Sequence, residues 1–356
     1  MDYASYLRLP QLLSNQQMES VRRGAPAHDE MLFIVMHQTY ELWFKQILFE
    51  LDLIQKAFGG AVVDDADLGR AVHAAERIVK IEHLLVGQID ILETMTPMDF
   101  LEFRNLLMPG SGFQSEQFRL IEIRLGLKRE ARLPFNDASY DASLPADARK
   151  HVIAAEAEPS LRDQIDAWLS RTPFVDKGGF HFREAYEKAL DSMLSHDMDQ
   201  IRRHPHLSQA EKDVQLTSLQ KSRAMFDGLL DDARYSELHA QGAWTFSRRA
   251  LQAALFLFLY RDEPAANAGF RMLKALMDMD ETFALWRMRH ALMVSRMLGR
   301  KVGTGGSAGY DYLRATADKH RAYNDLFAIA TFLIPRSALP PLPDDVRKSM
   351  RYRYEQ

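Results

Sequence analysis

The sequence contains no cysteine, which excludes disulfide bonds, a thiolate nucleophile and thiolate ligation of a metal. Any metal must be held by other ligands, such as histidine, aspartate, glutamate or tyrosine. The chain has no basic excess either, because 45 lysine and arginine residues stand against 49 aspartate and glutamate residues, for a formal net charge of -4. This balance gives no reason to expect a nucleic-acid partner. We expect small molecules or other protein chains as partners.

Long apolar runs are also missing. The N-terminus, MDYASYLRLPQLLSN, lacks the apolar core of a signal peptide, and the strongly apolar stretch 253–260 is too short to span a bilayer. We therefore expect a cytoplasmic protein with no membrane partner. The 356 residues, of which 47% are hydrophobic and 26% charged, are typical of a globular protein with ample core.

No convincing run alternates apolar and polar residues as a strand would, which predicts an all-α protein. Apolar residues recur at helical spacing over 28–54, 66–95, 247–260, 266–298 and 310–333. A short polar helix is expected at 11–22. We predict a helical bundle in four parts: an N-terminal segment (1–25), a helical core (26–127 and 246–335), an inserted linker and peripheral helical arm (128–245) and a tail (336–356).

One expected helix has a face with a single imidazole among large apolar groups. The spacings of three and four place on this face Trp286, His290, Met293 and Met297. Gly299 ends the helix, and the glycine-rich stretch 303–306 follows. His290 is either a hydrogen-bonded core residue or a ligand of a buried cofactor, and the helix alone does not decide between them.

Two further polar residues lie in apolar surroundings. His37 falls on the expected helix 28–54, on a stripe that includes Phe33. It is either a core histidine with a partner or a second imidazole facing a cofactor held between helices. Arg104 is flanked by Phe100 and Phe103. Its carboxylate partner belongs either to the protein or to a ligand.

Three segments resemble the haem-dependent tryptophan 2,3-dioxygenases. They are FIVMHQTYELWFKQI (33–47), SGFQSEQFRLIE (111–122) and WRMRHALMVSRMLGRKVGTGGSAGYDYL (286–313). The resemblance runs from Tyr3 to about Pro335, and the long segment 128–245 is similar to the animal-type members. It implies a helical bundle that encloses a b-type haem.

The resemblance also implies roles for individual residues. His290 would be the proximal iron ligand, and His37 would lie distally, near the indole N–H of the substrate. The residues expected beside heme b are Trp286, Ser111, Gly112 and Gly303. The clamp for the substrate carboxylate would be Arg104, helped by Thr304. The remaining substrate contacts would come from Phe33, Ile34, Phe100, Leu107 and Ser111.

The N-terminal residues match a further feature of the family. Tyr3, Tyr6 and Leu7 correspond to residues that enter the pocket of a neighbouring subunit, in a homotetramer built as a dimer of dimers. One position departs from the shorter bacterial members, which have a tyrosine four residues before the clamp arginine. Here that residue is Phe100, so no hydroxyl contact is expected.

The implied activity is insertion of both atoms of O2 across the indole C2–C3 bond of L-tryptophan, giving N-formyl-L-kynurenine in the first step of the kynurenine pathway. One alternative is a haem mono-oxygenase of the same superfamily that acts on another indole or aromatic amino acid. Another is a non-catalytic haem or tryptophan sensor. Arg104 and Thr304 favour an amino-acid substrate. For His37 we expect a hydrogen bond that orients the ring rather than the role of an essential base.

Overall fold

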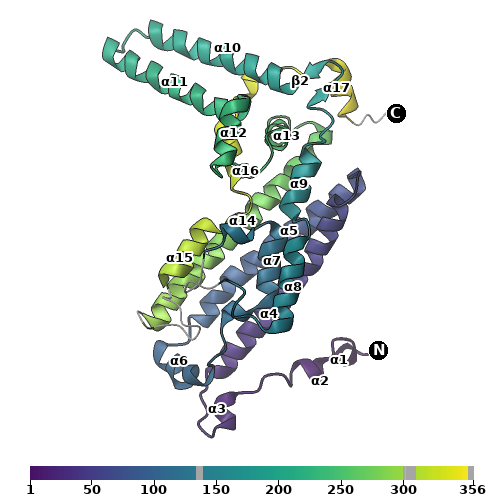
Figure 1. Ribbon diagram of the computed structural model, residues 1–356, viewed down its shortest axis with the longest axis vertical. Helices are drawn as coiled ribbons and strands as arrows, with labels where there is room; N and C mark the ends of the chain where they lie inside the picture. Colours follow the sequence, from purple (N-terminus) through teal and green to yellow (C-terminus); the bar gives the residue numbers. More distant parts are fainter. Residues whose placement is uncertain (134–138, 300, 302–309, 352–356) are drawn as a thin grey trace. The chain divides into compact units, whose positions relative to one another are not determined.

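The structure is a computed structural model, which describes residues 1–133, 139–299, 301 and 310–351 (Figure 1). Over this part of the chain the regular structure is helical apart from two short antiparallel strands, β1 (Asp176–Lys177) and β2 (Phe180–His181). The predicted all-α fold is confirmed. None of the helices in the described residues combines the length and the hydropathy of a membrane-spanning segment.

The chain divides into two compact units. The first comprises Met1–Gln55, His73–Leu161 and Asp278–Ala322, and the second Lys56–Val72, Arg162–Met277 and Tyr323–Gln356. This division differs from the expected core (26–127 and 246–335) and arm (128–245), because residues 246–277 belong to the second unit and 139–161 to the first. Apolar side chains explain the second difference, since Tyr140, Leu144 and Val152 share a buried cluster with Ile123.

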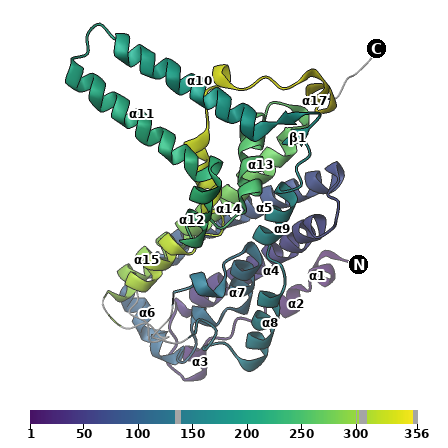
Figure 2. The same ribbon diagram turned by 45° about the horizontal axis from the view of Figure 1, so that its top comes forward.

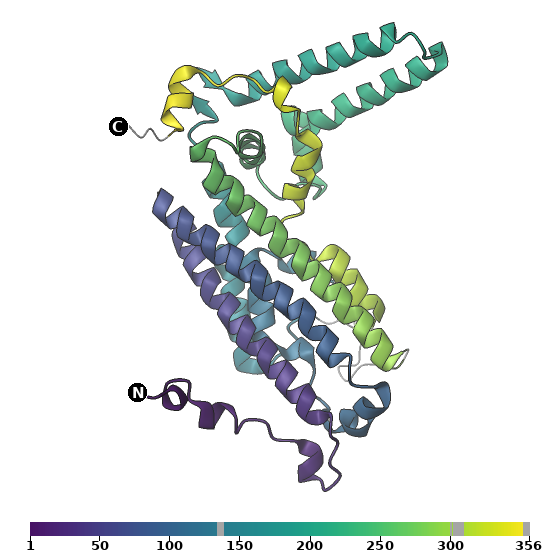
Figure 3. The same ribbon diagram turned by 180° about the vertical axis from the view of Figure 1, so that it is seen from behind.

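Two long helices lie side by side in the first unit, α4 (Glu30–Phe58) and α5 (Asp65–Leu92), as Figures 1 and 3 show. Their directions are opposite: Tyr40 Oη donates to Leu85 O (2.8 Å), while Glu50, further along α4, binds Arg77, earlier in α5 (2.6 Å). Both helices have apolar residues at helical spacing, which face each other and the rest of the unit.

The remaining elements of the first unit follow local signals. α6 (Pro97–Phe103) begins with a capping box between Thr96 and Asp99, and η1 (Arg104–Leu106) continues it. α7 (Glu116–Leu125) is capped by Ser115 and ends at Gly126, whose φ of 120° is left-handed. The other elements up to residue 161 are α1 (Tyr3–Tyr6), α2 (Leu9–Leu12), α3 (Glu19–Arg22), η2 (Gly112–Gln114), η3 (Arg129–Ala131) and α8 (Ala146–Ala157).

For two of the helices expected from the sequence, the predicted bounds are wrong. Residues 310–333 do not form one helix, because α15 (Tyr310–Lys319) stops and α16 (Asn324–Ala328) starts anew. Side chains of α14 (Pro264–Leu298) bind the intervening backbone: Arg287 donates to His320 O (2.9 Å), and Asp280 accepts from Ala322 N (2.8 Å). The helix expected at 11–22 is divided between α2 and α3.

The second unit holds a long antiparallel helix pair, α10 (Phe182–Arg203) and α11 (Gln209–Leu230), which stands out in Figure 2. α13 (Arg248–Leu259) is buried on nearly all sides, in agreement with its continuous apolar sequence. The other elements are α9 (Leu161–Leu169), α12 (Asp232–Ala240), η4 (Ile329–Phe332), η5 (Arg336–Ala338) and α17 (Asp344–Ser349).

Glu82 on α5 is an isolated buried carboxyl group. It is 1% exposed, and neither carboxyl oxygen has a hydrogen-bond partner among the described residues. Burial raises its pKa well above the usual value, the negative charge of Asp280 adds to the rise, and Arg287 opposes it. Glu82 is therefore a neutral carboxylic acid at neutral pH.

This neutrality predicts the effect of Glu82→Gln. In the unfolded chain Glu82 ionises near its ordinary pKa, whereas in the folded chain it keeps its proton to higher pH. The free energy of unfolding of the parent therefore decreases, by at most about 1.4 kcal/mol per pH unit, as pH rises from the unfolded towards the folded pKa. Glutamine has no such dependence. In urea titrations from pH 5 to 8, the stability of the variant relative to the parent should increase with pH, and a constant difference would contradict the assignment.

Candidate active site

An apolar cavity lies within the first unit, between α4, α7, α14, α15 and the end of α5. It encloses about 300 Å³ of space that the centre of a water molecule can reach. Its apolar lining comes from Phe33, Phe44, Ile89, Leu92, Met95, Phe100, Phe113, Phe118, Met293, Val294, Met297, Leu298 and Leu313. Such a mostly apolar cavity with a few convergent polar groups is typical of a small-molecule site.

The cavity brings together many of the site residues expected from the sequence. Those that line it are Phe33, His37, Phe100, Ser111, Gly112, Trp286 and His290. Its described lining does not include Ile34, Arg104 and Leu107, which lie close by on α4 and on the segment after α6. Gly303 and Thr304 lie outside the described residues. Tyr3, Tyr6 and Leu7 are on the surface of their own chain.

His37 faces the cavity with a defined tautomer. Its Nδ1 lies 2.7 Å from Phe33 O, and a carbonyl oxygen can only accept, so Nδ1 carries the proton. Burial lowers the pKa of His37, which outweighs the opposite effects of the Phe33 carbonyl and of Glu41. The ring is therefore neutral at pH 7, and its Nε2 has a lone pair that can accept a hydrogen bond in the cavity.

His290 is the second imidazole of the cavity. Burial, with a smaller effect from His37, lowers the pKa of His290 to about 4, so the ring is neutral at pH 7. The Trp286 ring lies one turn earlier and is stacked on it, with centroids 5.3 Å apart and an interplanar angle of 4°. A neutral imidazole of fixed orientation is the form that can bind a metal.

An aromatic cluster surrounds His37. The Phe33 ring centroid lies 4.0 Å from that of His37, 5.9 Å from that of Phe100 and 5.6 Å from that of Phe103. Arg104 directly follows the fully buried Phe103 and is half-buried at the start of η1. The segment from α6 to η1 therefore holds Arg104 next to the rings that line this part of the cavity.

Trp286 and Gly112 have features that protein contacts do not explain. Trp286 Nε1 is buried and makes no well-formed hydrogen bond among the described residues; it lies near the hydroxyl of Tyr40, which donates to Leu85 O, and burial raises the pKa of Tyr40 to about 12 against the smaller opposing effect of Trp286. A side chain at Gly112 would meet no described atom within 4 Å, and its φ is not left-handed. Neither the backbone nor neighbouring protein atoms require glycine there.

Part of the cavity lining is charged, which the sequence reasoning missed. Glu122 is 3% exposed, and its carboxylate accepts from Arg119 (3.0 Å), Arg132 (2.6 Å) and Arg287 (2.8 Å). His320 is also buried here; its Nε2 accepts from Leu133 N (3.2 Å), so its proton lies on Nδ1, 3.7 Å from Glu122. We name these five residues, Arg119, Glu122, Arg132, Arg287 and His320, the Glu122 cluster.

The Glu122 cluster has an excess of positive charge. Burial alone would raise the pKa of Glu122, but Arg132, together with smaller effects of His320, Arg119 and Arg287, holds that pKa well below its usual value. Burial lowers the pKa of His320, so this imidazole is neutral at pH 7. Three guanidinium groups thus share one carboxylate. Two of them, on Arg119 and Arg287, line the cavity. In the sequence, the only local sign of this cluster was the spacing of three residues between Arg119 and Glu122, which places the two side chains on one face of a helix.

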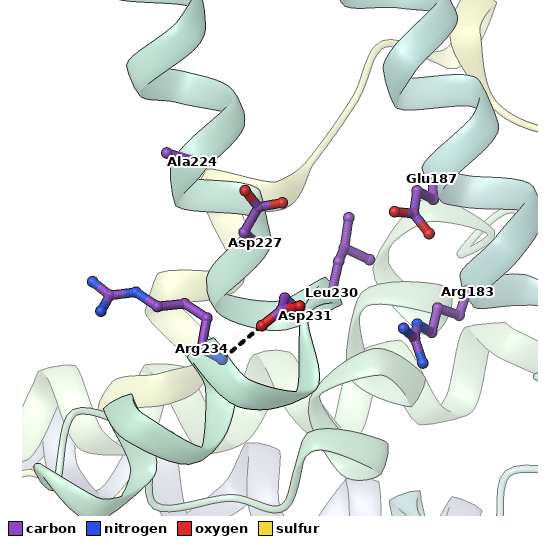
Figure 4. A pocket seen from close by; sticks show the side chains of 7 residues that line it. All are labelled: Arg183, Glu187, Ala224, Asp227, Leu230, Asp231 and Arg234. Atoms are coloured by element: carbon purple, nitrogen blue, oxygen red, sulfur yellow. Dashed lines mark hydrogen bonds between the residues drawn. The ribbon is translucent and has the colours of Figure 1, made fainter.

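A second, more open pocket lies in the second unit, and its charges are already paired. It is lined by Arg183, Glu187, Ala224, Asp227, Leu230, Asp231 and Arg234 (Figure 4). Asp231 accepts from the backbone N–H of Arg234 as the cap of α12, and Arg223 binds both Glu187 and Asp227. It lacks the imidazoles and the apolar lining of the first cavity, so we assign no reaction to it.

The fold and the cavity together define the class of protein: an all-α protein with an apolar cavity between helices, which two neutral imidazoles face. Residues 1–333 match the family model described as Tryptophan 2,3-dioxygenase. The chain belongs to the tryptophan 2,3-dioxygenase family and is an oxidoreductase. The resemblance inferred from the three sequence motifs is confirmed.

Relatives from distant organisms match over almost the whole chain. The Tryptophan 2,3-dioxygenase of Bdellovibrio bacteriovorus is 45% identical over 352 residues, which cover 99% of this chain and 98% of the relative. That of Dictyostelium discoideum is 44% identical, covering 99% and 88%, and that of Aedes aegypti 42% identical, covering 98% and 89%. These findings do not favour the mono-oxygenase and sensor alternatives.

The Glu122 cluster predicts a large loss of stability in Glu122→Gln. The change leaves three buried guanidinium groups around a neutral amide, and removing one partner of a buried ion pair costs on the order of 3 to 5 kcal/mol. Urea unfolding of the ligand-free protein at pH 7 measures the loss. Glu82→Gln is the matched control, because it makes the same change at a buried carboxyl group that is already neutral. Equal stabilities of the two variants would show that Glu122 does not hold the arginines.

Proposed function

We propose that the protein is a haem-dependent dioxygenase that inserts both atoms of O2 across the indole C2–C3 bond of L-tryptophan to give N-formyl-L-kynurenine, the first step of the kynurenine pathway. The family gives the reaction class. The observation that supports the assignment most strongly is one apolar cavity with two neutral imidazoles, one of which, His290, offers a lone pair to a metal. The proposed cofactor is heme b.

The residues of the cavity fit a haem. Among the described residues no group of three or more histidine, aspartate or glutamate side chains could hold a metal ion. A haem brings four ring nitrogens as ligands of its own and would need only one protein ligand, such as His290. The buried N–H of Trp286 and the remaining donors of Arg119 suit the two carboxylates of a haem. The absence of a side chain at Gly112 leaves room for a flat ligand.

Haem, when bound, supplies the redox chemistry that activates O2. The protein residues bind and orient the substrate. His37 Nε2 is an acceptor for the indole N–H, and Phe33 and Phe100 offer ring faces to the indole. Because Nδ1–H of His37 is already bound to Phe33 O, the imidazole cannot rotate without losing that hydrogen bond. His37 therefore fixes the orientation of the indole ring.

The amino-acid part of the substrate needs a separate binding group. Arg104 lies beside the aromatic cluster at the end of α6, and its guanidinium is suited to two parallel hydrogen bonds with a carboxylate. Together with Thr304 it would hold the carboxylate and the ammonium group. Ile34, Leu107 and Ser111 are the further proposed contacts, by resemblance to the family.

We also propose the homotetramer. α4 has an exposed apolar stripe at intervals of seven residues, Val35, Leu42 and Phe49, of which Phe49 is 67% exposed. A helix face of this kind favours association with another apolar surface. Tyr3 is 75% and Tyr6 70% exposed on their own chain, which suits the proposed insertion of residues 3–7 into a neighbouring copy.

The assignment of the cofactor is tested with His290→Ala. The variant loses the only proposed bond between the protein and iron, so we expect haem to dissociate readily, whereas the parent should contain about one haem per chain. Absorption spectra of the purified proteins, before and after anaerobic L-tryptophan, measure haem content and show whether the substrate binds beside it. Stoichiometric haem with an unchanged Soret band in the variant would show that His290 is not the ligand.

Arg104→Leu tests the proposed carboxylate clamp. Loss of one buried charge-assisted contact costs on the order of 2 to 5 kcal/mol, so the KM for L-tryptophan should rise strongly. Tryptamine, which lacks the carboxylate, should be affected far less. Steady-state kinetics on both substrates make the comparison, and equal losses would mean that Arg104 pairs with a protein carboxylate.

A further inference from the structure

The N-terminal segment is fastened to the start of α4 by a buried carboxylate. Glu30 is 1% exposed, and its two oxygens accept from Glu19 N (2.8 Å) and Ser20 N (2.9 Å), the first backbone N–H groups of α3. Ser20 is fully buried, and its hydroxyl accepts from Ala27 N (3.1 Å). These bonds hold α3 and the loop that follows it in one arrangement against α4.

A second attachment lies two turns further along α4. The side chain of Gln38 accepts from Gln16 Nε2 (2.6 Å) and donates to Asn15 O (3.2 Å). Residue 15 is outside any helix, and this bond gives its carbonyl a partner that a helix would otherwise have supplied. The segment 15–20 is therefore bound to α4 at two points, Gln38 and Glu30.

Residues 1–13, which we call the terminal arm, have no such attachment. Helices α1 and α2 contain no buried residue, and the described lining of the cavity in the same chain includes no residue of the arm. The arm runs away from the start of α4 in Figures 1 and 3. Its direction is set by the last attached residues, Asn15 and Gln16, because nothing described beyond them fixes it.

We propose that Glu30 and Gln38 are positioning residues, which direct the terminal arm so that Tyr3 and Tyr6 reach the cavity of a neighbouring copy of the chain. This inference rests on the proposed function, in which the arm completes that cavity. Two charge-assisted hydrogen bonds from backbone N–H groups to a buried carboxylate are strong enough to hold a short helix in place, whereas a neutral side-chain amide has only one oxygen that can accept. Glu30 would thus act on substrate binding without touching the substrate.

The test is a double-mutant cycle on the haem-loaded protein. Glu30→Gln and Gln38→Ala are each made in the full chain and in a chain that lacks residues 1–9. In the full chain we expect each substitution to raise the KM for L-tryptophan several-fold while kcat changes less than twofold, because the arm affects substrate binding. In the shortened chain, whose KM is already raised, neither substitution should raise KM further.

The control is Glu50→Gln on the same helix. Glu50 is also buried, at 2% exposed, but its partners are Arg77 and Gln46, and it has no bond to the arm. The substitution Glu50→Gln should therefore leave the KM for L-tryptophan unchanged. If Glu30→Gln and Gln38→Ala also raise KM in the shortened chain, the two residues act on α4 itself and not through the arm. This result would overturn the proposal. A shortened chain with the parent KM would instead remove the role of the arm, and with it the proposal. Should Glu30→Gln fail to fold, Gln38→Ala alone decides.

Discussion

The carboxylate of Glu122 is the interaction on which the first unit depends most. It binds guanidinium groups of α7, of α14 and of the segment after η3, and the contact with Arg287 joins residues 165 positions apart in the sequence. Three cations and one anion removed from water are stable only when every partner is in place. The geometry of the charged wall of the cavity is therefore fixed by one side chain.

Burial has opposite outcomes for two kinds of ionisable group in the cavity lining. At His37 and His290, burial keeps the imidazoles neutral, and at His37 it outweighs the charge of Glu41. Around Glu122, burial with several cationic partners keeps a carboxylate ionised. A ligand with an apolar body and carboxylates at one edge would have only one favourable orientation in such a cavity. The proposed haem has this shape, which is why the charge distribution favours it.

The sequence predicted what depends on local patterns. The long helices α4, α5 and α14 follow from their apolar periodicity, and Gly299 ends α14 with a left-handed φ of 59°, as expected. The break between α15 and α16 could not be predicted, because it results from Asp280 and Arg287, distant in sequence, binding the backbone. The Glu122 cluster was missed for the same reason. Both imidazoles were candidate cofactor ligands from their apolar helix faces, but only the resemblance to a family gave them specific roles, and these roles, like those of Arg104 and the terminal arm, stay predictions.

The hydrogen bond from His37 to Phe33 O also limits how protons can move. A histidine that relays protons takes one up at one nitrogen and releases one from the other. Here the Nδ1 proton is bound to a backbone carbonyl of the same helix, and a carbonyl oxygen does not pass a proton on. A proton received at Nε2 could leave only through Nε2, into the space it came from. His37 is therefore not a proton relay through the helix, and a proton that it accepts during turnover returns to the space that Nε2 faces.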